Sequence, residues 1–575
     1  MTTVDAIVLA GGRATRMGGV DKPALVVGGR SMLETALSAV ASCAHTVVVG
    51  PYRPELGPGI LQAREVPAGS GPVAAIAVGL TALADTADLV VVLAADMPFL
   101  TAGAVEQLIS QVGATGADAT FAADDSGRPQ YLVGVWRRAA LLAGLERLGT
   151  PVNQPMKALI PAHTATLALD TVADCDTPDD IARARAQAPP LSLDEARNVL
   201  RHKLSKLDAR RVTLRTASGA TLAEPLLAVE ALPRFDVSAM DGYAVAGAGP
   251  WQLRRDIGFA GGARPAGLQA GEAVRIATGA HVPEGTGTVV RDEFVHVDPD
   301  GLLHRLPGTP IRDDVRRRGE DWNPGDIVAA EGTPVSPALL SVAASAEVTT
   351  ALVRGPVRAR IIMTGDEIRG DGPLHTGQTR DSIGPVLPDL LSWCGIAPLG
   401  RVHLRDSPNG FDEVLAGTDD CELLVIVGAT GGGAADQLRA SLDRARAHIP
   451  VHRLRLRPGG STVVAEIGSG TTVLGLPGNP FAAVATLLAL APSIVEGRTT
   501  RPPRRALTGP LHNAAEISGS APRIVPARAA AEGGWLGDPN IRTAHLAGLL
   551  DRDGLAVVPA HAADGDLVEF LPLPS

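Results

Sequence analysis

The first residues of the chain join a short apolar strand to a glycine-rich turn. Residues Val4–Leu9 run directly into the string LAGGRATRMGGVDK, which ends at Lys22. Gly11 and Gly12 let backbone N–H groups approach phosphate oxygens without a Cβ in the way. Arg16 and Lys22 supply positive charge that offsets phosphate repulsion. The spacing matches neither an ATPase-type phosphate loop nor the dinucleotide fingerprint, so it predicts a different kind of nucleoside triphosphate site.

A second apolar strand ends in an acidic residue. Residues 89–95 form a continuous apolar run that Asp96 follows directly. Such a run predicts a central parallel strand, and ligands of parallel sheets bind at the carboxyl ends of the strands. Asp96 could instead cap the helix that starts near Thr101, but Pro98 intervenes and Thr101 is the better cap. We therefore expect Asp96 at the same end of the sheet as the glycine turn.

The composition is that of a globular chain with several domains. Its 575 residues are 45% hydrophobic and 3% aromatic, which is typical of a core built from small aliphatic side chains. The net charge of −10 opposes nucleic-acid binding. We expect no signal peptide and no membrane span, because the sequence contains no run of ~18 apolar residues. The 4 cysteines lack metal-ligand or disulfide spacing, which fits a reducing cytoplasm.

The sequence changes character near residue 190. The string AQAPP at residues 186–190 ends a helix and stiffens a short linker. Ser192 then opens a helical pattern with Glu195 three residues later, which is a capping box. Nothing beyond this point repeats the first part, so two different units are predicted rather than a duplication.

Three later strands each end in a glycine-rich or acidic turn. They are predicted at residues 357–363, 423–427 and 473–476. Helices between such strands indicate a doubly wound sheet with its ligand site at the strand carboxyl ends. The carboxylates of Asp366, Glu367 and Asp381 would converge there, and the glycine-rich turns would bind an anion through backbone N–H groups.

The N-terminal string resembles the signature of the nucleotidyltransferases that include molybdenum cofactor guanylyltransferase. The resemblance continues through GPVAAIAVGL, ADMP and DCDTPDDIARAR. It implies GTP as substrate, Asp96 as the residue that holds Mg²⁺, and Asp96 and Lys22 as catalytic residues. CTP is the alternative nucleotide, although cytidylyltransferase relatives have Ala-Ala-Gly in place of Leu-Ala-Gly. The implied nucleotide-binding residues are Leu9, Ala10, Gly11, Gly12, Arg16, Lys22, Gly71 and Asp96.

The sequence after residue 190 resembles molybdopterin molybdenumtransferase. The motif PRFDVSAMDGYAV at residues 233–245 carries the resemblance, and RRRGEDWNPGD, TGDEI, GQTRDS and LPGNP follow in order. The resemblance implies molybdopterin and molybdate as substrates, catalytic roles for Asp241 and Glu367, and a homodimer formed by this half. The implied binding residues are Asp241, Thr278, Asp321, Asp366, Glu367, Asp381, Ser382, Asp436, Gly478 and Asn479.

Structural roles remain open for three of these residues. Asp241 could support a turn with Gly242, and Thr278 could belong to an ordinary turn. Asp321 could form an ion pair with the arginines of residues 316–318.

Two motifs depart from the second family. The string GATGGGAAD is shorter than the family's segment and has Thr430 where serine is expected. The turn at residues 458–461 lacks the family's lysine, although Arg455 and Arg457 lie beside it in sequence. These losses leave two hypotheses for the second half, namely molybdate insertion or a catalytically degenerate molybdopterin-binding scaffold. A sugar-nucleotide pyrophosphorylase, which shares the glycine-rich start, is opposed by the molybdenumtransferase-like half.

The complete prediction is a multidomain α/β protein. A Rossmann-like nucleotidyltransferase domain covers residues 1–187, and β-rich N-terminal and linker domains cover residues 188–352. A doubly wound molybdopterin-binding-like domain follows at residues 353–500, and a small β-barrel ends the chain at residues 501–575. The expected partners are small molecules and a second copy of the chain, without nucleic acid or membrane.

Overall fold

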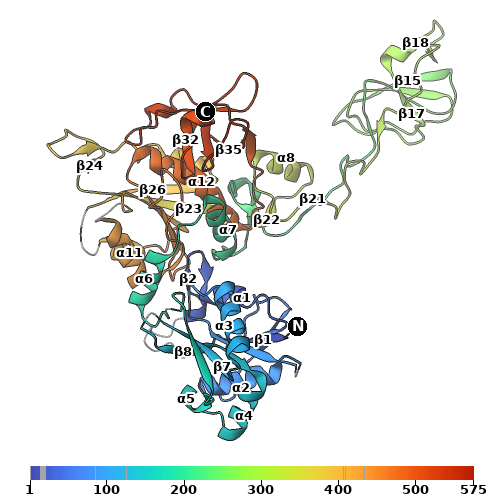
Figure 1. Cartoon of the computed structure of the whole chain (residues 1–575). Coiled ribbons are helices and arrows are strands. Elements are labelled where there is room, and N and C mark those ends of the chain that lie inside the picture. The colour runs from blue at the N-terminus through green and yellow to red at the C-terminus, as the bar shows by residue number, and fades with distance from the viewer. Residues whose placement is uncertain are drawn as a thin grey trace. The chain divides into compact units, whose positions relative to one another are not determined.

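The protein is described from a computed structural model. The structure describes residues 2–12, 21–84, 86–124, 126–172, 174–405, 407, 410–430 and 434–574. The chain divides into two compact units (Figure 1). The larger unit comprises Met1–Ser205, Arg358–Gly497 and Arg504–Ser575, and the smaller comprises Lys206–Val357 and Arg498–Pro503.

The larger unit begins with a seven-stranded sheet in the order β5-β4-β1-β6-β8-β7-β9. Strands β5, β4, β1 and β6 run parallel, so their carboxyl ends meet at one edge, whereas β8 is antiparallel to β6. This arrangement confirms the predicted Rossmann-like start. The strands are β1 (Val4–Leu9), β4 (Thr46–Val49), β5 (Ile60–Ala63), β6 (Leu89–Ala94), β7 (Ala119–Ala123), β8 (Pro129–Arg137) and β9 (Thr164–Ala168), and a small pair, β2 (Val26–Val27) and β3 (Arg30–Ser31), lies outside the sheet.

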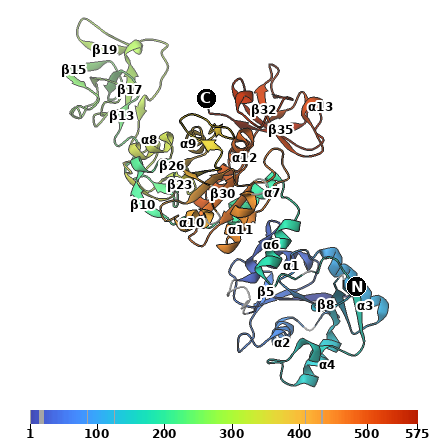
Figure 2. The same cartoon turned by 90° about the vertical axis from the view of Figure 1, so that its left-hand side faces the viewer.

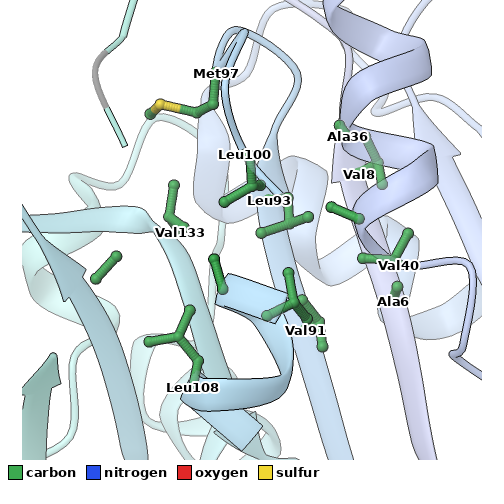
Figure 3. Packing of buried hydrophobic residues seen from close by; sticks show 14 of the residues in the cluster. Ala6, Val8, Ala36, Val40, Val91, Leu93, Met97, Leu100, Leu108 and Val133 are labelled. Carbon is green, nitrogen blue, oxygen red and sulfur yellow. The ribbon is translucent and has the colours of Figure 1, made fainter. Parts of the chain in front are cut away.

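Strand β1 is apolar on both faces because helices cover both faces. Ala6 and Val8 pack in the cluster that contains residues of α1 and α3 (Figure 3). Ile7 packs in the cluster that contains residues of α2. This two-sided burial explains why the strand reads as a continuous hydrophobic run rather than an alternating one. The helices of this part are α1 (Met32–Ala39), α2 (Pro72–Ala82), α3 (Ala102–Thr115), α4 (Arg138–Leu148), α5 (Met156–Leu159) and α6 (Pro178–Gln187), with the 3-10 turn η2 (Lys22–Ala24).

The helix caps at Thr101 and Ser192 fall where the sequence predicts them, and the structure adds a cap at Thr177. The Thr101 side chain accepts a hydrogen bond from the backbone N–H of Ala104 and so caps α3, which leaves Asp96 free of that role. Thr177 forms a capping box with Asp180 at the start of α6. Ser192 does the same with Glu195 at the start of α7 (Leu193–Lys203).

The second sheet of the larger unit has the order β26-β23-β27-β30-β29-β28. Strands β23, β27 and β30 are parallel neighbours, as predicted, and β29 and β28 extend the sheet antiparallel. The strands are β23 (Val357–Thr364), β26 (Ile396–Leu404), β27 (Leu423–Val427), β28 (His448–Val451), β29 (Val463–Glu466) and β30 (Thr472–Leu476), with a separate parallel pair, β24 (Ile368–Arg369) and β25 (Thr379–Arg380). The helices are α9 (Leu387–Trp393), α10 (Gly410–Ala416), α11 (Ala434–Arg444) and α12 (Pro480–Thr499).

Helix α12 is a core helix. It is the one described helix whose length and composition would suit a membrane span, yet 89% of its most apolar window is buried inside the protein. Its buried residues therefore contribute to the protein's own core.

The C-terminal strands form a small barrel (Figure 2). Their order is β31-β35-β34-β32-β33, with antiparallel neighbours throughout. A parallel bridge between Leu511 and Trp535 joins the ends of the two edge strands and closes the sheet, which confirms the predicted barrel. The elements are β31 (Leu507–Pro510), α13 (Ala514–Ile517), β32 (Arg523–Ala529), β33 (Trp535–Gly537), η5 (Ala547–Leu549), β34 (Gly554–Val558) and β35 (Leu567–Pro572).

The smaller unit is mostly β, as its glycine- and proline-rich sequence indicates. Its largest sheet has the order β17-β14-β16-β15-β19-β18, and helix α8 (Pro337–Ser345) is capped by Ser336. The strands are β10 (Arg210–Thr213), β11 (Thr221–Leu222), β12 (Leu226–Leu227), β13 (Val237–Ser238), β14 (Gly242–Val245), β15 (Trp251–Gly258), β16 (Glu272–Ile276), β17 (Thr288–Arg291), β18 (Val295–Val297), β19 (Leu302–Arg305), β20 (Val315–Arg316), β21 (Ile327–Ala329) and β22 (Thr350–Arg354), with 3-10 turns η3 (Leu214–Thr216) and η4 (Asp292–Phe294).

Candidate functional site

The glycine turn follows β1 at the carboxyl edge of the first sheet. The backbone N–H of Ala10 donates to the Val49 carbonyl at 2.8 Å, which holds the turn beside the end of β4. A Cβ on Gly50 would lie 2.7 Å from the Ala10 oxygen, so only glycine permits this approach. Gly12 has a φ of +138°, a backbone conformation that favours glycine. Arg16 lies outside the described residues.

Lys22 and Asp96 come together as the two strand ends require. The Lys22 ammonium lies 2.8 Å from Asp96 Oδ2 and also 2.8 Å from Asp176 Oδ1. Burial alone would lower the pKa of Lys22, but Coulombic attraction from Asp96 and a hydrogen bond to Asp176 outweigh it and raise the net pKa. Lys22 therefore carries its positive charge between two carboxylates.

The carboxylates around Lys22 have the chemistry of a divalent-cation site. Asp96 Oδ1 is buried and has no hydrogen-bond partner among the described residues. A buried carboxylate oxygen is costly unless a donor or a cation meets it. Desolvation, followed by repulsion from Asp176 and Asp96, raises the pKa of Asp174.

Protein ligands alone do not complete a metal centre here. Within the described ranges no cluster of three or more His, Cys, Asp or Glu side chains is arranged to hold a metal. Mg²⁺ normally takes one or two carboxylates together with substrate phosphates. The residues around Asp96 therefore fit Mg²⁺ that arrives with a nucleotide.

A buried arginine orients the segment that carries Lys22. Arg53 donates from Nη1 and Nη2 to the two carboxylate oxygens of Asp21, at 2.9 and 2.6 Å. Its side chain is 6% exposed, and the hydrogen bond to Asp21 raises its pKa. Such a two-pronged contact fixes direction as well as distance. Arg53 could not be recognised from the sequence, where it is a single charged residue in a loop.

Gly71 lies at a helix start next to the glycine turn. It has a φ of +92° and precedes α2, which has no side-chain cap. Glu65 Oε1 accepts the N–H of Gly69 at 2.9 Å and lies 4.0 Å from the position of a Cβ on Gly11. The loop before α2 therefore lies close to the first glycine turn, and its uncapped N–H groups suit an anion.

In the smaller unit, Asp241 and Thr278 meet. Asp241 Oδ1 accepts the backbone N–H of Thr278 at 2.7 Å and its hydroxyl at 2.9 Å. The hydrogen bond from the Thr278 backbone is the main cause that lowers the pKa of Asp241. A Cβ on Gly242 would lie 2.2 Å from the Val290 carbonyl oxygen, which explains the glycine in this motif.

Asp321 forms an ion pair with Arg316. The local structural contact that the sequence left open is thus present. Any role of Asp321 in substrate binding stays a prediction.

In the second sheet of the larger unit, the carboxyl ends of β23, β27 and β30 lie close together. The Thr364 hydroxyl, at the end of β23, donates to the Val427 carbonyl at 2.8 Å. A Cβ on Gly478 would lie 3.3 Å from Gly428 Cα, so the turn after β30 lies against the turn after β27. The Glu367 carboxylate lies close to Gly365, because a Cβ on Gly365 would be 2.5 Å from Glu367 Oε2. Asn479, which follows Gly478, is exposed.

Asp381 is already well paired. It is buried, accepts the backbone N–H of Gly384 at 2.7 Å and contacts Arg401 Nη1 at 3.1 Å. These bonds hold the Asp381 side chain in place, while Asp366 and Ser382 are exposed. The side chain of Asp436 lies outside the described part of the chain. His403, which sequence reasoning missed, places Nε2 2.9 Å from the Gly365 carbonyl oxygen.

The two departures from the family pattern are in contact. Thr430 Oγ1 lies 3.0 Å from Ser461 Oγ, in the turn that lacks lysine. Arg439 donates to the Ser461 carbonyl at 2.8 Å and so supports the turn from α11. A neutral hydroxyl pair therefore stands at this position.

Three family models match the chain in sequence order. A MobA-like NTP transferase domain matches residues 6–167, the MoeA N-terminal region (domain I and II) matches residues 191–346, and a probable molybdopterin binding domain matches residues 360–496. Together, fold and site define a protein that joins an NTP-transferase domain to a molybdopterin-binding part.

Curated relatives cover the second part. A molybdopterin molybdenumtransferase of Haemophilus influenzae is 29% identical over 314 residues, which are 53% of this chain and 77% of the relative. Molybdopterin molybdenumtransferase 2 of Mycobacterium tuberculosis is 31% identical over 310 residues, which are 51% of this chain and 76% of the relative. The chain therefore belongs to the molybdopterin molybdenumtransferase family, whose members act in molybdenum cofactor biosynthesis.

A solved structure agrees with this at the level of fold. The molybdopterin biosynthesis MoeA protein from Pyrococcus horikosii superimposes with a TM-score of 0.53 at 22% identity. The match covers 67% of this chain and 100% of that one.

Proposed function

We propose that the N-terminal domain transfers GMP from GTP to molybdenum-loaded molybdopterin. The observation that carries this proposal is the convergence of Lys22 and Asp96 at the edge where the glycine turn lies. An oxygen of the pterin's terminal phosphate attacks the α-phosphorus of GTP, the bond from that phosphorus to the bridging oxygen breaks, and pyrophosphate leaves. Such transfers depend on positioning and charge neutralisation rather than on a covalent nucleophile.

The chain's own residues have defined tasks in this reaction. Backbone N–H groups at Gly11 and Gly12 bind the triphosphate, and the Lys22 ammonium neutralises its charge. Asp96 would hold Mg²⁺, which when bound would offset the negative charge of the phosphates. Leu9 and Ala10 shape the turn, and Arg16 and Gly71 complete the proposed nucleotide site.

The test of this half is GMP transfer by the full chain. Asp96→Asn should abolish pyrophosphate release from GTP with molybdenum-loaded molybdopterin as acceptor. Asp179→Asn, an exposed carboxylate in the first turn of α6, is the matched control and should keep activity. Retained transfer in Asp96→Asn at ordinary Mg²⁺ would refute the assignment. Replacing GTP by CTP in the same assay decides the base, and we expect GTP to be preferred.

For the second half we propose molybdate insertion into adenylylated molybdopterin with release of AMP. Membership in the molybdenumtransferase family supports it, as does the contact between Asp241 and Thr278. The proposed binding residues are Asp241, Thr278, Asp321, Asp366, Glu367, Asp381, Ser382, Asp436, Gly478 and Asn479. Full-length protein without GTP should release AMP from adenylylated molybdopterin only when molybdate is added, and molybdenum should become bound to the pterin.

A specific observation favours a second candidate for this half. The neutral Thr430–Ser461 pair occupies the turn where the family has a lysine, so one cationic contact to an anionic substrate is missing. A scaffold would bind adenylylated molybdopterin yet produce neither AMP nor bound molybdenum. That result would leave GMP transfer as the only catalysis of the chain.

The proposed partners are GTP, molybdopterin, molybdate and a second copy of the chain that pairs through the C-terminal half. We propose a cytoplasmic location, which fits the four cysteines that the structure shows as free thiols. Nucleic acid and membranes are not among the proposed partners.

A further inference from the structure

Lys22 occupies the space between two carboxylates that come from different segments. Asp96 follows β6, and Asp176 precedes the cap of α6, yet both have an oxygen 2.8 Å from the same Nζ. Those two oxygens are therefore separated by no more than twice this distance. A small cation in the place of the ammonium would require each oxygen to move closer by about 0.7 Å, since Mg²⁺ takes oxygen ligands at about 2.1 Å.

The ammonium is well placed but is not locked in position. Its side chain is 15% exposed, and Asp176 is 48% exposed, so solvent reaches the pair. Lysine carries its charge on a flexible four-carbon stem and has three equivalent donors. The Arg53–Asp21 contact restrains residue 21 and does not involve the Lys22 side chain, which can turn once its two hydrogen bonds are broken.

Three properties of this cluster point to an exchange of cations. The proposed reaction needs the Lys22 charge on the triphosphate, whereas the structure shows it on Asp96 and Asp176. Without a positive charge, these two carboxylates would repel each other across a short gap. The buried Asp96 Oδ1 has no hydrogen-bond partner among the described residues, so the ammonium leaves part of Asp96 unsatisfied.

We propose that Lys22 is a built-in placeholder for the divalent cation of the nucleotide site. In the nucleotide-free protein its ammonium neutralises Asp96 and Asp176. When metal and nucleotide bind together, Lys22 turns onto the phosphates, and both carboxylates become available to the metal. Asp176 is then a second metal-contacting residue, and metal without nucleotide binds weakly because it must displace the ammonium. This inference rests on the proposed nucleotidyl transfer.

The experiment measures metal binding without nucleotide or turnover. Full-length protein is titrated with Mn²⁺, and free Mn²⁺ is followed by its electron paramagnetic resonance signal. Lys22→Met should bind Mn²⁺ about tenfold more tightly than the wild type, because no charge-assisted hydrogen bond has to be broken first. The double variant Lys22→Met/Asp176→Asn should lose that gain.

A matched lysine provides the control. Lys203 forms an ion pair with Glu34 in the same unit, so Lys203→Met also removes one positive charge but leaves the Asp96–Asp176 pair intact. Its Mn²⁺ affinity should equal that of the wild type. Thermal melting of every variant verifies the fold, and Lys22→Gln serves if Lys22→Met does not fold.

The outcomes separate this inference from the proposed function. Unchanged Mn²⁺ affinity in Lys22→Met would overturn the placeholder role, as would a gain that survives the Asp176→Asn change. Failure of the wild type to transfer GMP, with the Mn²⁺ gain intact, would reject the proposed reaction and leave the cation exchange standing.

Discussion

Replacing Arg53 should weaken nucleotide binding although Arg53 lies outside the predicted site. Its guanidinium holds Asp21 through two hydrogen bonds of 2.9 and 2.6 Å, and Asp21 precedes Lys22 in the chain. Arg53→Ala removes this clamp, so the segment that presents the ammonium gains freedom. Lys22 should then spend less time in the position that neutralises the triphosphate.

The size of the expected loss in nucleotide binding follows from the two hydrogen bonds and from the exposure of Asp21. Hydrogen bonds to charged groups contribute about 1.5–3 kcal/mol. Asp21 is 53% exposed, so water replaces part of the lost interaction. We therefore expect a cost of about 1–2 kcal/mol in nucleotide binding, which corresponds to about a tenfold rise in KM for GTP. The value of kcat should change less, because Asp96 is untouched.

Steady-state kinetics with GTP and molybdenum-loaded molybdopterin provides the assay. Arg53→Lys keeps a positive charge but cannot make the two-pronged contact, so it should also raise KM. Thermal melting separates positioning from a structural defect. An unchanged KM in both variants, alongside a lowered melting temperature, would show that Arg53 only stabilises the fold and would refute the reasoning.

Three further predictions concern pH and packing. Burial, and then repulsion from Arg439, lowers the pKa of His452 to about 4. The free energy of unfolding should therefore fall by ~3 kcal/mol as the pH drops from 6.5 towards 4, because the unfolded chain binds the proton more readily. Urea unfolding at both pH values should show a smaller loss in His452→Gln. Thr278→Val removes one hydrogen bond to Asp241 and should raise the pKa of that carboxyl, which NMR titration of its side chain can measure. Leu93→Ala removes a fully buried side chain from the first sheet and should cost about 2–5 kcal/mol of unfolding free energy, without the KM change of a site variant.

The sequence predicted what local chemistry and periodicity determine. The central strands, the caps at Thr101 and Ser192, and the parallel run β23-β27-β30 depend on patterns within short segments. Asp96 could be placed near the glycine turn because parallel strands bring their carboxyl ends to one edge.

Contacts that join distant segments could not be predicted in this way. Arg53 and Asp21 are 32 residues apart, and neither belongs to a recognisable motif as a pair. Lys22 and Asp176 are 154 residues apart, and which of the acidic residues before α6 would face the lysine depends on how that segment crosses the sheet edge. No periodicity encodes such a crossing. The partner of Asp381 could not be predicted for a similar reason, since Arg401 lies 20 residues further along the chain, in β26.

The contact between Thr430 and Ser461 changes how the two departures from the family pattern should be weighed. Counted in sequence, a replaced serine and a lost lysine are two separate defects. In the structure the hydroxyls of Thr430 and Ser461 are 3.0 Å apart, and Arg439 donates a hydrogen bond to the Ser461 carbonyl. The two departures therefore belong to one site. The hydroxyl pair of this site carries no charge, and hydroxyl groups cannot neutralise an anion as an ammonium does. A substrate bound mainly through its pterin would still bind, whereas a step that requires charge neutralisation would be slowed. Molybdate-dependent AMP release is therefore more sensitive to this change than pterin binding, and comparison of the two separates insertion from scaffolding.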